Sequence, residues 1–345
     1  MVQVKIKEVL QKVSRPKRIP TSEYLSEGAY PVIDQGQNVI AGYTNDEDAV
    51  ISSPLPMVIF GDHTRAVKFS KVPFATGADG TQLLYPQEGI DPTYFYYAVK
   101  NVDLSNYFYA RHFKYLKEKE ITIFDLPTQQ KIASVLSAYD DLIENNRRCM
   151  EILEESARLI YRKMFGDDVP DADRWPVVKI GDILCKVHRA VKIPKEEYCE
   201  SGAYPCIDQS REFIGGYTNN EAAVNHDLPA IVFGDHTRIL KFVRFPFASG
   251  ADGTQLIRSN DGRISQEFLY YALLEIDLTN YFYARHFKIL KSKDLRLPPF
   301  DLIAEFTRVV SPMTERTAVL IQENVKLAEA RDMLLPKLMS GAEIG

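Results

Sequence analysis

Two long stretches of the chain repeat apolar or small residues at steps of three and four positions. The first, Thr128 to Phe165, contains no proline or glycine. Its repeating positions are Ile132, Val135, Tyr139, Leu142, Cys149, Leu153, Ser156, Ile160 and Met164. In the second, Leu302 to Met339, they are Phe306, Val309, Met313, Thr317, Leu320, Asn324, Leu327, Leu334 and Leu338. This spacing predicts two helices, each packed along a partner helix.

Each of these seams carries one asparagine, Asn146 in the first and Asn324 in the second. A polar residue in such a seam fixes the register of the two helices at some cost in stability. At 1.5 Å per residue the first helix would be about 55 Å long, longer than an ordinary domain helix. The alternative is that both helices belong to one large globular core.

The rest of the chain is an internal duplication in which the second copy follows the first by 173 or 174 residues. The repeated motifs are GAYP at 28 and 202, IDQ at 33 and 207, GYTN at 42 and 216, FGDHTR at 60 and 233, PFA(T/S)GADGTQL at 73 and 246, and NYFYARHFK at 106 and 280. A repeat of this size indicates a duplicated domain, because solenoid modules have periods of about 20–50 residues.

We therefore predict two globular domains that alternate with two helices: residues 1–127, 128–166, 167–300 and 301–345. Within the first domain, residues 57–60 and 66–69 are typical of strands, and Asp91 to Val99 predicts a helix with proline just inside its start. The predicted fold class is α+β: two tandem-duplicated α/β globular domains, each built on a twisted mixed sheet, separated by a long antiparallel two-helix coiled coil with pseudo-two-fold symmetry.

A two-fold arrangement within one chain suits a target with two-fold symmetry, and duplex DNA read as two half-sites is the common example. Half-sites one helical turn apart lie about 34–36 Å from centre to centre, a distance that helices of this length can hold.

Composition excludes several classes of function. The 345 residues carry a net charge of −5, which decides little about nucleic acid because many acidic residues lie on the two helices. There is no run of 18 apolar residues, so we expect no membrane span, and the four scattered cysteines are typical of a reduced cytoplasmic protein. Phosphate-loop, zinc-protease, dinucleotide and amino-methyltransferase motifs are absent, so we expect neither catalytic residues nor a metal site.

The FGDHTR motif gathers an imidazole, a hydroxyl and a guanidinium directly after an apolar strand. Such a loop is a usual place for binding residues, and arginine can fork onto guanine or a phosphate. The predicted DNA-binding residues here are His63, Thr64 and Arg65 in the first copy and His236, Thr237 and Arg238 in the second. The alternative is structural: Asp62 caps a turn and Arg65 pairs with it.

The NYFYARHFK motif interleaves basic residues with aromatic rings, which suits contact with a nucleic-acid backbone. The predicted contact residues are Arg111, His112 and Lys114, their counterparts Arg285, His286 and Lys288, and, extending this surface, Arg15 and Arg189. Tyr107, Phe108, Tyr109 and Phe113 are more simply explained as core. Segments 37–40 and 211–214 differ between the copies, as do 52–56 and 225–229. These loops could distinguish two half-sites or could be ordinary surface variation.

The chain resembles the specificity subunits of type I restriction–modification systems. RHFKYLKEKEI leading into LPTQQKIASVL is similar to that family's first conserved helical region, and LRLPPF with ENVKLAEARDMLLPKLMSG is similar to its C-terminal region. The resemblance covers essentially the whole chain. It departs from the family where Pro127 to Gln130 replace an acidic run, and in the close similarity of the two domains, which implies similar half-sites.

The resemblance implies a non-catalytic subunit that binds a bipartite, gapped and nearly palindromic site in double-stranded DNA. Its partners would be two adenine-N6 methyltransferase subunits and the restriction/translocase subunits. S-adenosylmethionine, Mg²⁺ and ATP would belong to those partners, with no cofactor in this chain. The alternatives are the recognition subunit of a related phage-defence system and a coiled-coil scaffold that binds protein.

Overall fold

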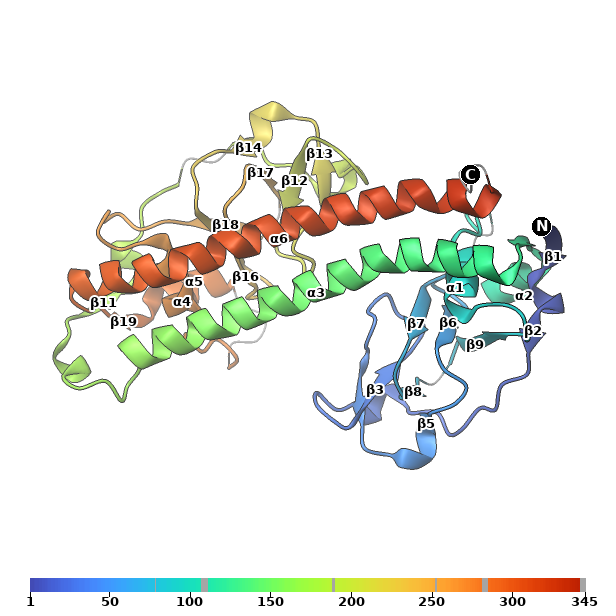
Figure 1. Ribbon diagram of the computed structural model, residues 1–345. Helices are drawn as coiled ribbons and strands as arrows, with labels where there is room; N and C mark the ends of the chain where they lie inside the picture. Colours follow the sequence, from blue (N-terminus) through green and yellow to red (C-terminus); the bar gives the residue numbers. More distant parts are fainter. Residues whose placement is uncertain (78, 107–110, 188–189, 252, 281–284, 342–345) are drawn as a thin grey trace. The chain divides into compact units, whose positions relative to one another are not determined.

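The computed structural model describes residues 1–77, 79–106, 111–187, 190–251, 253–280 and 285–341. The chain forms two compact units, one made of residues 1–144 with 325–345 and the other of residues 145–324. Each unit contains one copy of the duplicated domain and one segment from each of two long helices (Figure 1).

The first domain distributes its strands among three sheets. The strands are β1 (Val2–Lys5), β2 (Leu10–Gln11), β3 (Tyr30–Ile33), β4 (Gly42–Thr44), β5 (Val50–Ile51), β6 (Met57–Gly61), β7 (Val67–Ser70), β8 (Phe74–Thr76), β9 (Thr81–Pro86) and β10 (Glu120–Ile123). The sheet orders are β1-β10, β2-β9-β6-β7 and β4-β3-β8-β5. Parallel pairing joins β3 to β8, with Val32 opposite Ala75, and the other pairs are antiparallel.

The second domain repeats this arrangement. Its strands are β11 (Val177–Lys179), β12 (Tyr204–Ile207), β13 (Gly216–Thr218), β14 (Val224–Asn225), β15 (Ala230–Gly234), β16 (Leu240–Val243), β17 (Phe247–Ser249), β18 (Thr254–Ile257) and β19 (Asp294–Arg296). Their sheet orders are β11-β19, β16-β15-β18 and β13-β12-β17-β14. Each domain therefore confines its parallel pair to one of three sheets, β4-β3-β8-β5 or β13-β12-β17-β14, instead of building a single mixed sheet as the sequence had suggested.

The helices are α1 (Pro92–Lys100), α2 (His112–Glu118), α3 (Leu126–Phe165), α4 (Gln266–Leu274), α5 (His286–Ser292) and α6 (Phe300–Ser340). Short 3-10 helices cover Ile6–Glu8, Thr21–Glu23, Glu47–Ala49, Ala172–Arg174, Ile180–Ile183, Lys195–Glu197 and Glu221–Ala223. The predicted strands at 57–60 and 66–69 and the predicted helix at 91–99 are confirmed as β6, β7 and α1. Asp91 begins α1 because its carboxylate accepts a hydrogen bond from the Tyr94 amide at 2.8 Å.

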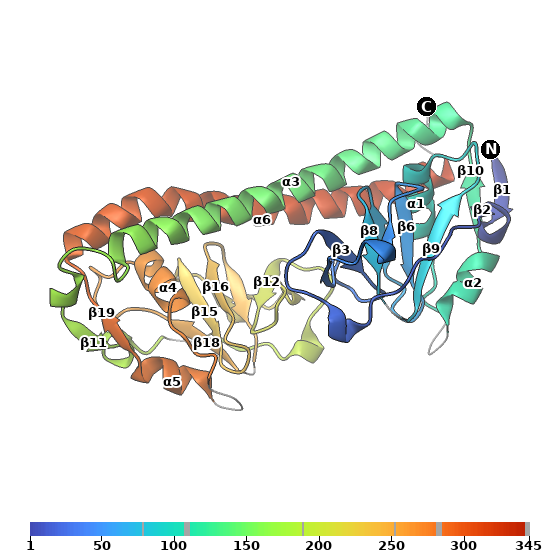
Figure 2. The same cartoon turned by 90° about the horizontal axis from the view of Figure 1, so that it is seen from below.

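Helix α1 covers the β2-β9-β6-β7 sheet of the first domain (Figure 2). Phe69 on β7 stacks on Tyr96 of α1, with ring centroids 4.9 Å apart. Buried residues of β6 and α1 form one hydrophobic core with Ile132 of α3 and Leu338 of α6. The domain therefore packs against both long helices, which extends its own core.

The long helices pair antiparallel within each unit. In the first unit, Asp140 of α3 forms an ion pair with Arg331 of α6. The core of this unit also joins Ile132, which is nearer the start of α3, to Leu338, which is nearer the end of α6. In the second unit, Asn146 lies 2.9 Å from Asn324, and Tyr161 contacts Phe306, with ring centroids 5.8 Å apart. Residue numbers rise along one helix as they fall along the other, so the predicted antiparallel pairing is confirmed.

The buried face of the long helices differs from the predicted seam. Val135, Leu142 and Val309 are exposed, whereas their neighbours Leu136, Ile143 and Val310 are buried. A heptad seam assumes that a helix buries residues against one partner helix. Other predicted seam residues, Ile132, Phe306, Leu320 and Leu338, are buried as expected. Each helix also packs against a globular domain, and this second contact shifts the buried face at the three exposed positions.

The helix ends also differ slightly from prediction. Helix α3 begins at Leu126, two residues before the predicted stretch, and ends with it at Phe165, and α6 runs from Phe300 to Ser340 where the stretch was Leu302 to Met339. Pro127 lies in the first turn of α3, where the missing N–H of proline costs nothing. No helix among the described residues is long and apolar enough to cross a membrane.

Candidate functional site

The FGDHTR motif forms the turn between β6 and β7. The Gly61 amide donates to the Ala66 carbonyl at 2.8 Å, and the Arg65 amide donates to the Gly61 carbonyl at 2.8 Å. This closure requires a left-handed backbone at Arg65, where φ is 62°. Arginine rarely adopts this conformation, since its Cβ then crowds the carbonyl oxygen. Arg238 has the same conformation in the second copy, with φ 64°.

Asp62 joins this turn to the start of α2. Its carboxylate accepts a hydrogen bond from the Phe113 amide at 2.8 Å, which satisfies one of the unpaired amides of the helix end. Its carbonyl accepts from the His112 amide at 2.9 Å. Asp62 therefore has a structural role, but it caps the start of a helix and not a turn, and Arg65 does not pair with it.

Two further repeated motifs meet the same turn. The Thr64 hydroxyl donates to the Gln35 carbonyl, and the Gln35 side-chain oxygen accepts from the His63 amide at 3.3 Å. The Asp62 amide donates to the Gly80 carbonyl at 2.7 Å. Gly80 has φ 75°, a conformation that glycine adopts without strain. We call this assembly of residues 34–37, 61–66, 79–80 and 111–114 the loop cluster of the first domain.

The second domain builds the same loop cluster from residues 208–211, 234–239, 253 and 285–288. Asp235 accepts from the Phe287 amide at 2.8 Å, and the Thr237 hydroxyl donates to the Gln209 carbonyl at 2.7 Å. The Asp235 amide donates to the Gly253 carbonyl at 2.7 Å. Motifs far apart in the sequence thus come together, twice, at one end of the central strand of each domain.

The cluster presents several of the predicted binding residues to solvent. The exposed predicted residues are His63, Arg65, Arg111, Lys114, His236, Thr237, Arg238, Arg285, Lys288 and Arg15, and Thr64 is half-buried. One guanidinium nitrogen of Arg65 donates to the Leu104 carbonyl at 3.2 Å, and Arg238 donates likewise to Leu278 at 3.0 Å. These two arginines therefore hold a neighbouring loop as well as facing solvent.

His112 and His286 lie inside the protein, contrary to the expectation that they contact a ligand. Each is 5% exposed, and each ring contacts a carbonyl through Nδ1: that of Asp62 at 2.9 Å, or that of Asp235 at 2.7 Å. The backbone amide of each histidine donates to the same carbonyl, so the residue is fixed against the turn. We leave both histidines out of the surface proposed below.

Arg15 lies on the segment that crosses the β2-β9-β6-β7 sheet and donates to the Gln82 side chain at 2.8 Å. Partial burial and the nearby charge of Arg18 lower the pKa of Arg15. Arg189 lies outside the described residues, as do Tyr107, Phe108 and Tyr109, so the predictions for them stay predictions.

Each cluster has a buried lysine beneath it that the sequence patterns did not identify. Lys68 on β7 donates to the Asp34 carbonyl at 2.8 Å. Lys241 on β16, 4% exposed at its side chain, donates to the carbonyls of Glu212 and Phe213. Burial lowers the pKa of Lys241 to about 8, although Asp208 and Glu212 favour its charged form. The alternation of strand β16 would have placed Lys241 inward, but a lone lysine in a strand gives no sign of its partner.

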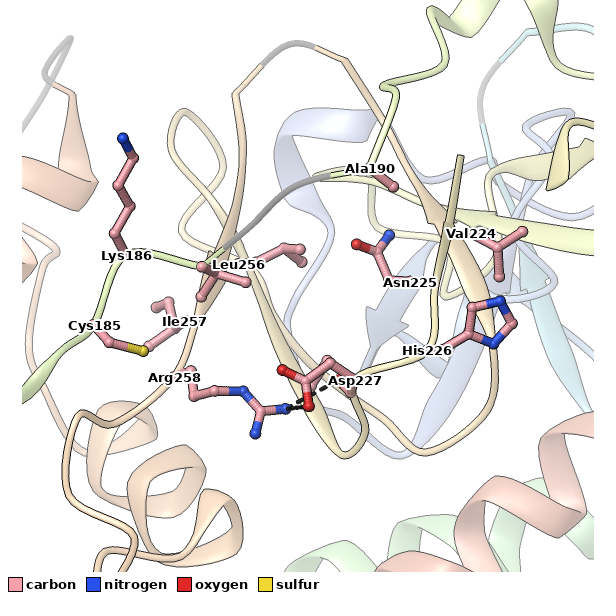
Figure 3. Close-up of a pocket in the computed structure, with 12 residues that line it drawn as sticks. Cys185, Lys186, Ala190, Val224, Asn225, His226, Asp227, Leu256, Ile257 and Arg258 are labelled. Atoms are coloured by element: carbon pink, nitrogen blue, oxygen red, sulfur yellow. Dashed lines mark hydrogen bonds and ion pairs between the residues drawn. The ribbon is translucent and has the colours of Figure 1, made fainter. Parts of the chain in front are cut away.

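A cavity of about 330 Å³ lies at the opposite end of β15 in the second domain (Figure 3). Asp227 and Arg258 form an ion pair of 2.8 Å beside it, and His226 also lines it. The first copy has Pro54, Tyr85 and Ser53 at the corresponding positions. The charged lining is therefore particular to the second domain, unlike the loop cluster. Among the described residues, no group of three His, Cys, Asp or Glu side chains is placed to hold a metal ion.

Comparison with known proteins agrees with this duplicated architecture. Residues 1–155 match the family model described as type I restriction modification DNA specificity domain. The chain is 28% identical over 323 residues to the type I restriction enzyme MjaIX specificity subunit of Methanocaldococcus jannaschii, covering 80% of this chain and 74% of that protein. It is 23% identical over 256 residues to the putative type I restriction enzyme MjaX specificity subunit of the same organism, covering 66% of this chain and 60% of that protein.

The fold is also that of a solved structure, the type I restriction-modification system S subunit from M. genitalium. The TM-score is 0.55 at 18% identity, over 98% of this chain and 96% of that one. Over 80% of its length the chain is similar to a type I specificity subunit. The matched specificity domain includes the whole loop cluster of the first domain and most of α3. The second domain lies outside this match and repeats the motifs and contacts of the first.

Proposed function

We propose that this specificity subunit binds a bipartite DNA site, with one half-site for each domain. The observation that carries the proposal is the duplicated loop cluster, in which one scaffold presents the same exposed cations twice. Arg111 and Lys114 in the first copy and Arg285 and Lys288 in the second are exposed. Contacts to phosphates need only charge and reach, and they set the position of a protein on the duplex.

The close likeness of the two clusters supports half-sites that are similar to each other. A helix pair that is continuous with both domains supports a gapped site, since the bases between the half-sites need no contact. The type I specificity family further supports a role as a non-catalytic subunit. Adenine-N6 methyltransferase subunits would bind it, together with restriction and translocase subunits, and S-adenosylmethionine, Mg²⁺ and ATP would act on those partners.

Methylation mapping tests this proposal directly. We would express the subunit with its methyltransferase subunit in a host without other adenine methylation and locate every N6-methyladenine by long-read sequencing. We expect one gapped motif with two similar half-sites. The control is the methyltransferase expressed without this subunit, which should leave the genome unmethylated. Two outcomes would overturn the proposal: methylation that does not depend on this subunit, or methylation of a continuous motif without a gap.

A further inference from the structure

The loop that connects β3 to β4, and its counterpart between β12 and β13, keeps the same flanks and changes its tip. Both copies have Tyr-Pro-x-Ile-Asp-Gln before the tip and Gly-Tyr-Thr-Asn after it. Directly after Gln35 and Gln209, the first copy has Gly36 to Val39 and the second has Ser210 to Phe213. Every one of these four positions differs, which is unusual beside flanks that are nearly unchanged.

The base of each loop is anchored to the loop cluster by the same contacts. Gln35 bonds the turn through its carbonyl and its side-chain oxygen, and Gln209 does so at 2.7 Å and 3.1 Å. The buried lysines lie under the two loops and bond loop carbonyls. A loop that is fixed at its base holds its tip in a defined place, which is what recognition of a fixed geometry requires.

The tips themselves carry exposed polar side chains. Gln37 and Asn38 are exposed in the first domain, and Arg211 and Glu212 in the second. The side chains of Asn38 and Arg211 hydrogen-bond to no other described residue, whereas Gln37 donates to the Thr64 carbonyl at 3.4 Å. Val39 beside them is 56% exposed, an apolar group that nothing in the domain covers within the described residues.

The chemistry of these tips differs in the way that base recognition requires. Side-chain amides pair in a bidentate manner with adenine in the major groove, arginine pairs with guanine, and glutamate accepts from cytosine. The identical cations of the cluster suit phosphates, which are the same in every sequence, while the differing tips suit bases. A requirement for solubility alone would be met equally well by polar residues of any kind, in either copy.

We propose that the tips at residues 36–40 and 210–214 read base pairs, the first domain favouring A·T through Asn38 and Gln37 and the second favouring G·C through Arg211 and Glu212. The inference rests on the proposed function, because it assigns the bases within a site that each domain already binds. The clusters then hold the two half-sites through their phosphates in the same way, and the half-sites differ at the base pairs that face the tips.

Exchange of the tips tests this inference. The variant Gln37→Arg/Asn38→Glu gives the first domain the polar tip of the second, and Arg211→Gln/Glu212→Asn makes the reverse change. Both pairs are exposed, so the fold should tolerate them. In the methylation assay of the whole complex, we expect the first variant to convert an A·T pair of one half-site to G·C and leave the other half-site unchanged. Methylation of the original motif should fall at least about tenfold.

Asp48→Ala is the matched control, because it also replaces an exposed residue by its counterpart, Ala222, but lies outside the loop. It should leave the methylated motif unchanged. If an exchanged complex methylates nothing, Asn38→Ala and Arg211→Ala replace it, and each should make one base pair of its half-site degenerate.

An unchanged motif in the exchange variants, or undiminished selectivity in both alanine variants, would overturn the inference. The unaltered subunit would still direct methylation to a gapped motif in that case, so the proposed function would stand. Failure of the proposed function would instead appear as a wild-type complex without a gapped motif.

Discussion

In each domain one carboxylate, that of Asp62 or Asp235, connects the turn of the loop cluster to the start of a helix. Each is nearly buried, at 6% and 7% exposed, and each accepts the amide of the residue that follows a buried histidine. The exposed cations next to that histidine, Arg111 and Lys114 in the first copy, therefore take their positions from an acidic residue. An acidic group can be indispensable to a surface that binds an anion, because it orients the cations without facing the ligand.

Replacing Asp62 by alanine should lower the free energy of unfolding by about 1–3 kcal/mol, because the Phe113 amide is left without an acceptor in a buried position. DNA binding should weaken with it. Asp62→Asn keeps an acceptor oxygen and should recover most of both effects. Chemical denaturation and a DNA-binding titration measure the two effects. If Asp62→Asn were as damaging as Asp62→Ala, the carboxylate charge and not the hydrogen bond would be responsible.

Lys241 makes the stability of the second domain depend on pH. Burial lowers its pKa from the ordinary value of 10.5 to about 8. The unfolded chain then binds more protons than the folded protein between these two values, so this group's contribution to the free energy of unfolding rises with pH across that window. Below about pH 8 both states are protonated, and the full cost of burying the charge is present.

Lys241→Met should remove this dependence. Compared with the variant, the wild-type domain should gain stability as the pH rises from about 7.5 to about 9.5, measured by denaturant unfolding at each pH. Lys288→Met alters an exposed lysine and should show no such gain. A wild-type protein whose stability relative to Lys241→Met fell over this range would contradict the assigned direction of the pKa shift.

At the scale of elements, Asn146 and Asn324 of the two long helices hydrogen-bond to each other. The Asn146 amide donates to the Asn324 side-chain oxygen at 2.9 Å, and Asn146 is 5% exposed. Paired polar groups in an apolar seam are satisfied in one register, since a shift by one turn would leave each facing a hydrophobic residue. Helix α3 has a second fixed point at Gln129, which accepts from the Asp91 amide at 2.8 Å and donates to the Phe124 carbonyl at 2.8 Å.

Single replacement of Asn146 by leucine should destabilise the second unit by about 1 kcal/mol or more, because Asn324 is deprived of this partner. Replacing both asparagines by leucine should cost less than the two single changes together and could raise the melting temperature. A double-mutant cycle by thermal unfolding gives the coupling free energy. Additive single effects would mean that the two side chains do not stabilise each other.

At the scale of the whole molecule, the duplication permits each domain to be tested against its own half of the target. Arg111→Ala/Lys114→Ala alters the first loop cluster, and Arg285→Ala/Lys288→Ala makes the same change in the second. Each double variant serves as the matched control of the other.

Each double variant should weaken binding to the complete site and reduce the salt dependence of log K by about 1 for each phosphate that the domain no longer neutralises. The loss of affinity should persist when the half-site of the altered domain is scrambled in the DNA, because scrambling changes the bases and leaves the phosphates in place. Binding titrations at several salt concentrations measure both quantities. An unchanged salt dependence in either double variant would show that the cations of that cluster do not contact phosphates.

Sequence patterns predicted the elements of this molecule better than its seams and contacts. Local signals were sufficient for β6, β7 and α1, because strand composition and a proline after an N-capping aspartate act over a few residues. The repeat predicted which residues share a role, and motif resemblance predicted the family. His112 was misassigned, because a basic residue among aromatics has the same pattern whether it faces solvent or the Asp62 carbonyl.

The sequence by itself therefore determined the duplication, the two long helices and their antiparallel order, since periodicity and repeated motifs specify each of them. Only the tertiary structure decided which face of α3 is buried, because that face serves two neighbours at once. It also decided that four motifs far apart in the chain form one loop cluster, with Asp62, Gln35 and a buried lysine as its fixed points. Hydrogen bonds between distant loops leave no periodic pattern in the sequence, so these partners can be identified only in the folded chain.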